Sequence, residues 1–260
     1  MLRAVSRIKW KKVFFSVLLM NWGFLTNCRS PVPSAPERPA RPAAAEDRLS
    51  ERLHMVEQQL AGRDIHNRQV LEAMRRVPRH LFIPAENRPD AYEDNPVPIG
   101  FGQTISQPYI VGFMTQALRL KGGEKILEIG TGSGYQAAVL AEVGARVYTI
   151  EIIEPLAREA DARLKSLGYA SIQVRCGDGY QGWPEEAPFD AVIVTAAPER
   201  IPQPLIDQLA EGGSMIIPVG VFTQDLILLQ KTPEGLRKKA ILPVRFVPMT
   251  GKAQIAAPPR

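Results

Sequence analysis

Apolar positions recur every three or four residues in the first part of the folded chain. This spacing predicts amphipathic helices over residues 47–61 and again from Val70 to Val77. Residues 84–107 are rich in Pro, Gly and Asn and have little periodicity, which is typical of an irregular segment that is often functional. A third helix is expected over residues 108–120, because proline is well placed in a first turn.

From Lys125 onward, short apolar runs alternate with helical patterns. The expected strands are residues 125–129, 146–151, 172–176, 189–195, 214–219, 226–231 and 241–247. The expected helices among them are residues 135–143, 155–167 and 204–209. Alternating strands and helices indicate an α/β fold with a mostly parallel, doubly wound sheet. The last strands have no helix between them, so we expect an antiparallel edge, in addition to the N-terminal helices.

The first 28 residues have a different character. Five basic residues between positions 3 and 12 precede an apolar run over residues 13–25. A basic stretch before a short apolar run is typical of an export signal, and the run is shorter than the about 20 residues of a transmembrane helix. Cys28 follows Leu-Thr-Asn, which resembles a lipoprotein cleavage box except that Asn27 replaces a small residue. We therefore predict an export signal or membrane anchor over residues 1–28.

Residues 29–46 are rich in Pro and Ala and are predicted to be a linker, so the folded domain covers residues 47–260. The net charge of +5 comes from the N-terminal part, because residues 1–48 hold nine Lys or Arg and three Asp or Glu. The folded part is nearly neutral, and we expect no nucleic-acid partner. Three scattered histidines and two cysteines lack metal-ligand spacing, so no metal site is proposed.

A glycine-rich motif follows the first strand of the alternating pattern. Gly130, Gly132 and Gly134 have the spacing G-x-G-x-G, and Glu128 lies two residues before them. Glycines there let a ligand approach the backbone, and the following helix presents unpaired N–H groups. A dinucleotide site usually has G-x-G-x-x-G. The spacing here resembles the first motif of Rossmann-like methyltransferases, which implies S-adenosylmethionine as the cofactor.

Two more acids stand at the ends of predicted strands. Glu151 ends the second strand, where a carboxylate can accept hydrogen bonds from ribose hydroxyls. Asp178 follows the third strand, and in methyltransferases an acid there commonly binds the adenine amino group. The predicted cofactor-binding residues therefore include Glu128, Gly130, Gly132, Gly134, Glu151 and Asp178.

Several separate segments resemble the protein-L-isoaspartate O-methyltransferase family. The most specific is P-I-G-F-G-Q-T-I-S-Q-P at residues 98–108, and the resemblance extends from about Leu49 to Thr250. Other matching segments are residues 77–79, 128–136, 177–179, 188–190, 194–198, 218–220 and 244–248. The resemblance implies a Rossmann-like enzyme that esterifies the free carboxylate of L-isoaspartyl residues in damaged proteins and so initiates their repair. It also implies a cytoplasmic enzyme, whereas residues 1–28 suggest export or a membrane tether.

The resemblance also assigns roles to individual residues. Ser106 matches the active-site serine and would contact the substrate, while Thr104 and Ile105 belong to a loop that is near the cofactor. The substrate-binding groove would be lined by Val244, Phe246 and Val247. The alternative for Ser106 is a helix-capping role before Pro108.

The target carboxylate is already ionised at neutral pH, so no general base is expected. A second interpretation of the whole chain is an S-adenosylmethionine-binding protein with another acceptor or no catalysis. Amino-group methyltransferases often carry Asn/Asp-Pro-Pro-Tyr/Phe where this chain has Thr-Ala-Ala-Pro at residues 195–198, which argues against that class. We expect a monomer.

Overall fold

The computed structural model describes residues 48–251. The predicted signal or anchor and the whole of the predicted linker lie outside the described residues, so these predictions stay untested. Among residues 48–251, no helix combines the length and the apolar character needed to cross a membrane.

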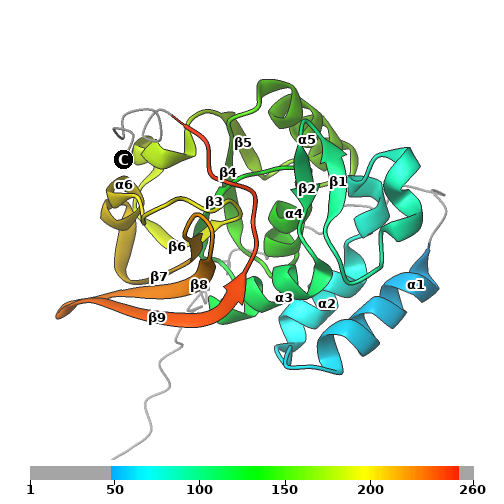
Figure 1. The fold of residues 1–260 in the computed structure, drawn as a ribbon, viewed down its shortest axis with the longest axis horizontal. Helices are drawn as coiled ribbons and strands as arrows, with labels where there is room; N and C mark the ends of the chain where they lie inside the picture. The colour runs from blue at the N-terminus through cyan, green and yellow to red at the C-terminus, as the bar shows by residue number, and fades with distance from the viewer. Residues whose placement is uncertain (1–47, 252–260) are drawn as a thin grey trace, which may run out of the picture. The chain divides into compact units, whose positions relative to one another are not determined.

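A seven-stranded sheet with the order β5-β4-β3-β6-β7-β8-β9 forms the centre of the fold (Figure 1). Its strands are β3 (Lys125–Ile129), β4 (Arg146–Glu151), β5 (Gln173–Cys176), β6 (Phe189–Val194), β7 (Leu209–Val219), β8 (Gln224–Thr232) and β9 (Gly235–Val244). The strands from β5 to β7 run parallel, and β8 and β9 add antiparallel pairs at one edge. The predicted α/β fold with an antiparallel edge is therefore confirmed.

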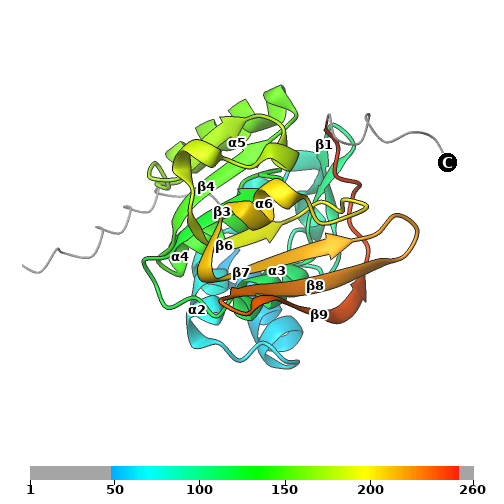
Figure 2. The ribbon, with the colours of Figure 1, turned by 90° about the vertical axis from the view of Figure 1, so that its left-hand side faces the viewer.

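The central strand β3 is buried on both faces because helices cover both. Ile126 packs in one hydrophobic cluster and its neighbour Leu127 in the other, as expected when successive side chains point to opposite faces. The first cluster contains residues from α3 (Pro108–Ala117), α4 (Tyr135–Glu142) and α5 (Glu154–Ser166). The second contains residues from α6 (Gln203–Asp207). Figure 1 shows α6 and α3 on opposite sides of the sheet, and Figure 2 shows the β8–β9 hairpin beside α6.

The two predicted N-terminal helices are present. The first consists of α1 (Leu49–His54) and a π-helical continuation, η1 (Met55–Ala61). The second is α2 (Arg68–Arg76), whose first turn is capped by Asn67 because its Oδ1 accepts a hydrogen bond from the backbone N–H of Val70 at 3.2 Å. The helix ends before Pro78, since the residue preceding a proline favours extended backbone.

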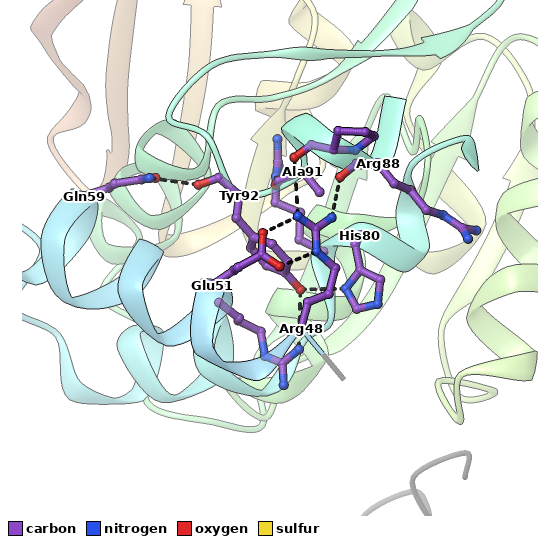
Figure 3. Close-up of polar contacts among 10 residues, drawn as sticks. Arg48, Glu51, Gln59, His80, Arg88, Ala91 and Tyr92 are labelled. Carbon is purple, nitrogen blue, oxygen red and sulfur yellow. Dashed lines mark hydrogen bonds and ion pairs between the residues drawn. The ribbon is translucent and has the colours of Figure 1, made fainter. Parts of the chain in front are cut away.

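Polar side chains fasten the N-terminal helices to the segment that follows them (Figure 3). This segment contains two 3₁₀ turns, η2 (Arg79–Phe82) and η3 (Ala85–Asp90). Gln59 donates to the carbonyl oxygen of Tyr92 at 2.8 Å, and the Tyr92 hydroxyl lies 2.7 Å from Nδ1 of His80. These contacts fix the chain just before Asp94, which lies beside the candidate site.

Several parts of the chain differ from the sequence prediction; strand β7, for example, begins at Leu209 rather than at residue 214. Residues 84–107 contain a hairpin of β1 (Val97–Gly100) and β2 (Gln103–Ile105), which are too short to display an alternating pattern. Phe101 in its turn has a positive φ of 52° between two glycines. Strand β9 begins at Gly235 rather than at residue 241. The sequence pattern missed its first half because that half carries exposed charged residues, as edge strands often do.

Candidate active site

A cavity opens at the carboxyl ends of the central parallel strands, where α/β sheets bind ligands. We call it the central cavity. It is lined by residues 103–106, 130–133, 150–153 and 247–250, together with Val111, Ile129, Tyr135, Gln136, Gly179, Thr195 and Ala196. Five of the predicted cofactor residues are therefore on its wall: Thr104, Ile105, Gly130, Gly132 and Glu151.

The glycine loop between β3 and α4 leaves no room for a side chain at position 130. Gly130 has a φ of 93°, and a Cβ there would overlap Oγ1 of Thr195. That hydroxyl holds the loop, because it lies 3.0 Å from the carbonyl oxygen of Ile129 and 2.7 Å from that of Gly130. Gly134 is not on the cavity wall; it is the left-handed N-cap residue of α4.

The carboxylate of Glu151 ties the end of β4 to the glycine loop. Its Oε2 accepts a hydrogen bond from the backbone N–H of Gly132 at 2.9 Å, and its Oε1 accepts one from Ile153 at 3.0 Å. A carboxylate has about four lone-pair positions, so two more hydrogen bonds can be accepted from a ligand. Because Glu151 lines the central cavity, these positions fit the two hydroxyls of a ribose.

Glu128 lies beneath the site rather than on its wall. Its side chain is fully buried and does not line the central cavity. The pKa of Glu128 is raised to about 8, mainly by burial; the Thr149 side chain opposes this rise, and the charge of Glu151 makes a smaller contribution to it. Glu128 is therefore mainly uncharged at neutral pH, which suits a buried carboxyl group.

Asp178 is also absent from the cavity wall, although its neighbour Gly179 is present. Its Oδ1 accepts a hydrogen bond from the backbone N–H of Tyr180 at 2.9 Å and so caps the 3₁₀ turn η4 (Gly179–Gln181). Gly251 packs so closely on Asp178 that a Cβ on residue 251 would overlap the carboxylate. The structure therefore places Asp178 behind Gly251.

A second cavity of about 510 Å³ adjoins the first, and we call it the groove. Its lining includes all four residues predicted to contact the substrate: Ser106, Val244, Phe246 and Val247. Four residues line both cavities: Thr104, Ser106, Thr195 and Val247. The central cavity and the groove therefore meet at the loop of Thr104 and Ser106.

Ser106 lies two residues before the start of α3 and does not cap it. The N-cap residue is Gln107, which makes no capping hydrogen bond through its side chain. Instead, Oδ1 of Asp94 accepts a hydrogen bond from the backbone N–H of Tyr109 at 3.2 Å, and Nε2 of Gln107 donates to Oδ2 of Asp94 at 2.8 Å. Asp94 thus stabilises the helix start and leaves the Ser106 side chain on the walls of both cavities.

The chain that follows β9 forms one wall of the groove. The side-chain amide of Gln224 bonds both backbone groups of Phe246, with distances of 2.6 Å to its N–H and 3.1 Å to its carbonyl oxygen. Ala197 then pairs with the segment, donating to the carbonyl oxygen of Val247 and accepting from the N–H of Met249, both at 2.8 Å. We call residues 244–250 the C-terminal segment. It lines the groove with its first half and the central cavity with its second half.

Sequence reasoning missed several residues of the central cavity. Thr195 could have been found, because it follows a strand adjacent to β3 at the same edge of the sheet. Thr131 and Ser133 lie between the predicted glycines and are found by position. The sequence gives no such signal for Met249 and Thr250. These residues line the cavity because their segment pairs with Ala197, which lies far earlier in the sequence.

Known proteins are similar to this chain in sequence and in fold. A family model described as protein-L-isoaspartate(D-aspartate) O-methyltransferase matches residues 50–254. The protein-L-isoaspartate O-methyltransferase of Gloeobacter violaceus is 59% identical over 198 residues, which cover 75% of this chain and 97% of that protein. A solved protein-L-isoaspartate O-methyltransferase superposes with a TM-score of 0.70 and 27% identity, over 78% of this chain and 66% of that one.

A Plasmodium falciparum structure of the same description was solved in complex with S-adenosyl-L-homocysteine. It matches with a TM-score of 0.66 and 26% identity, over 76% of this chain and 98% of that one.

Proposed function

The chain belongs to the protein-L-isoaspartate O-methyltransferase family, and from this premise we infer that it methylates the free carboxylate of L-isoaspartyl residues in damaged proteins, which initiates their repair. The enzyme uses S-adenosylmethionine as its methyl donor. The observation that carries the assignment to this site is the meeting of the two cavities at Thr104 and Ser106. A methyl donor in one cavity can thereby face a carboxylate in the other.

The central cavity fits the cofactor by its donor and acceptor groups. Glu151 offers carboxylate positions to ribose hydroxyls, and Gly130 and Gly132 present bare backbone on the cavity wall. Gly179 gives a flat wall between Ile129 and Met249, since a Cβ there would overlap Ile129 and press on Met249. These residues would hold the cofactor, with Thr104 and Ile105 on the side of the groove.

S-adenosylmethionine supplies a methyl group on a positively charged sulfur, which is reactive toward an ionised carboxylate. The substrate carboxylate is ionised at neutral pH, so the protein does not have to remove a proton. The work of the site is orientation and the exclusion of water, which together contribute up to about 7–11 kcal/mol in well-oriented reactions.

Ser106 is the residue that orients the substrate in this proposal. Its hydroxyl lies where both cavities meet and would donate a hydrogen bond to the isoaspartyl carboxylate or accept one from the adjacent backbone. The groove residues Val244, Phe246 and Val247 would contact the peptide on either side. Glu128 and Asp178 would act indirectly, by supporting β3 and the C-terminal segment.

The chemical nature of the product tests this assignment. The full chain is incubated with an isoaspartyl peptide and S-adenosylmethionine that is radiolabelled on its methyl group, and the labelled peptide is then treated with mild base. A methyl ester releases its label as methanol, which is the expected result. A base-stable label would indicate another acceptor group, and cofactor binding without any label would support the alternative of a binding protein.

Two further proposals concern a membrane tether and the oligomeric state. We propose that residues 1–28 tether the enzyme to a membrane, on the basis of their basic and apolar sequence pattern. We also propose that the enzyme acts as a monomer.

A further inference from the structure

The groove contains, outside the lining of the central cavity, a stacked and hydrogen-bonded arginine. Arg63 follows the first N-terminal helix, and its guanidinium carbon lies 3.4 Å from the centre of the Tyr109 ring. Its Nη1 donates to Oδ2 of Asp94 at 3.0 Å. Stacking and pairing together hold the guanidinium in a defined orientation. Arg63 and Tyr109 both line the groove.

The position of Arg63 is close to the catalytic loop. Oδ2 of Asp94 accepts hydrogen bonds from both Arg63 and Gln107, and Gln107 directly follows Ser106 in the chain. Arg63 lines only the groove, whereas Ser106 lines both cavities. Of the two residues only Ser106 reaches the cavity in which the methyl donor would bind, so a carboxylate bound by Arg63 alone would not be the one that is methylated.

The charged side chains that line the groove are basic, while two carboxylates outside the lining, Asp94 and Asp64, interact with Arg63 and Tyr109 respectively. Its lining contains Arg63 and Arg245 and, among residues 48–251, no aspartate or glutamate. Asp94 lies behind this lining, and its two oxygens accept hydrogen bonds from Arg63, Gln107 and Tyr109. Arg63 has five N–H donors, of which one bonds Asp94, and its side chain is 44% exposed. The remaining donors can bind a carboxylate in the groove.

On these grounds we propose that Arg63 is a specificity-determining residue, which binds the carboxylate of an acidic side chain that neighbours the isoaspartyl residue in the substrate. The proposal rests on the proposed function, because it assumes that a peptide lies in the groove with its isoaspartyl carboxylate at Ser106. An acidic neighbour is expected to raise kcat/KM through tighter peptide binding. Because Arg63 is partly exposed to water, the expected gain is modest, about three- to fivefold.

The test compares isoaspartyl peptides that differ at one position. At each of the two positions on either side of the isoaspartyl residue, a Glu peptide is paired with its Gln twin, and kcat/KM is measured with the full chain. At least one Glu peptide should be preferred by about three- to fivefold, and added salt should reduce the preference. Equal rates for every pair would overturn the role of Arg63, whereas no methylation of any isoaspartyl peptide would instead contradict the proposed function.

Variants then locate the preference. Arg63→Gln should bring the Glu-to-Gln ratio close to one, and Arg63→Lys, which keeps the charge but loses the planar fork, should retain part of it. The matched control is Arg237→Gln, which removes one positive charge from an exposed position on β9 outside the groove and should leave the ratio unchanged. A preference that survives in Arg63→Gln, or that disappears only in Arg245→Gln, would overturn the proposal.

Discussion

Oε2 of Glu151 accepts a hydrogen bond from the backbone N–H of Gly132 at 2.9 Å, so the last residue of β4 holds the middle of the glycine loop that follows β3. The two strands are paired in parallel, which brings their carboxyl ends to the same edge of the sheet. One carboxylate thereby shapes the loop and also presents acceptor positions to the central cavity.

Replacing Glu151 by alanine should weaken cofactor binding strongly. The variant loses the contact to Gly132 and the expected bonds to the ribose. Since a hydrogen bond to a charged group contributes about 1.5–3 kcal/mol, we expect an affinity loss of about 10- to 100-fold. Isothermal titration calorimetry with S-adenosyl-L-homocysteine measures it. Glu154→Ala, at an exposed position in the first turn of α5, is the control and should bind normally. Unchanged affinity in Glu151→Ala would remove the ribose role.

Replacing Ser106 by alanine should slow turnover while leaving cofactor affinity nearly unchanged. One neutral hydrogen bond contributes about 0.5–1.5 kcal/mol, which corresponds to a loss of up to about tenfold in kcat, or somewhat more if the bond forms mainly in the transition state. Steady-state kinetics with an isoaspartyl peptide provide the measurement, and the exposed Ser171→Ala serves as the matched control. A wild-type rate in Ser106→Ala would contradict the orienting role.

The buried Glu128 predicts a specific dependence of stability on pH. Its folded pKa of about 8 lies above the ordinary value of 4.5, so the folded state binds the proton more tightly than the unfolded state. The contribution of the protonated Glu128 to the free energy of unfolding is therefore fully present below pH 4.5. It is lost as the pH rises toward 8, by about 1.4 kcal/mol per pH unit at most. In Glu128→Gln the side chain cannot ionise, so this loss of stability with rising pH does not occur.

Relative to wild type, Glu128→Gln should therefore become more stable as the pH rises from 5 to 8, and the difference should level off above 8. Urea unfolding at pH 5, 6.5 and 8 measures the change. The exposed Glu159→Gln on α5 should show no such trend relative to wild type. A stability difference between Glu128→Gln and wild type that is independent of pH would show that Glu128 is not buried as a neutral acid.

The sequence was sufficient for the fold class and for the half of the site that lies on regular elements, but not for the β1–β2 hairpin. Gly130, Gly132 and Glu151 were predictable because the ends of parallel strands converge at one edge of the sheet. The local pattern could not show that Asp178 is covered by Gly251, because this contact joins residues far apart in sequence. For the same reason Arg63 gave no signal: its role depends on packing against Tyr109 and Asp94.

The C-terminal segment predicts a shared effect on both ligands. The Tyr180 hydroxyl donates to the carbonyl oxygen of Met249 at 3.2 Å and so anchors a segment that lines the central cavity and the groove. Tyr180→Phe should raise the cofactor Kd and the peptide KM together, each by about two- to tenfold, because one neutral hydrogen bond is lost. Tyr169→Phe removes a buried tyrosine hydroxyl outside both cavities and should change neither constant. A change confined to one ligand would argue against a shared wall.

The central claim is that this chain methylates isoaspartyl carboxylates, and one comparison tests it most directly. The full chain is given radiolabelled S-adenosylmethionine and two peptides of the same sequence, one with an L-isoaspartyl linkage and one with a normal aspartyl linkage. We expect label on the isoaspartyl peptide and essentially none on its aspartyl twin. Equal labelling of both peptides, or none on either despite measured cofactor binding, would contradict the account.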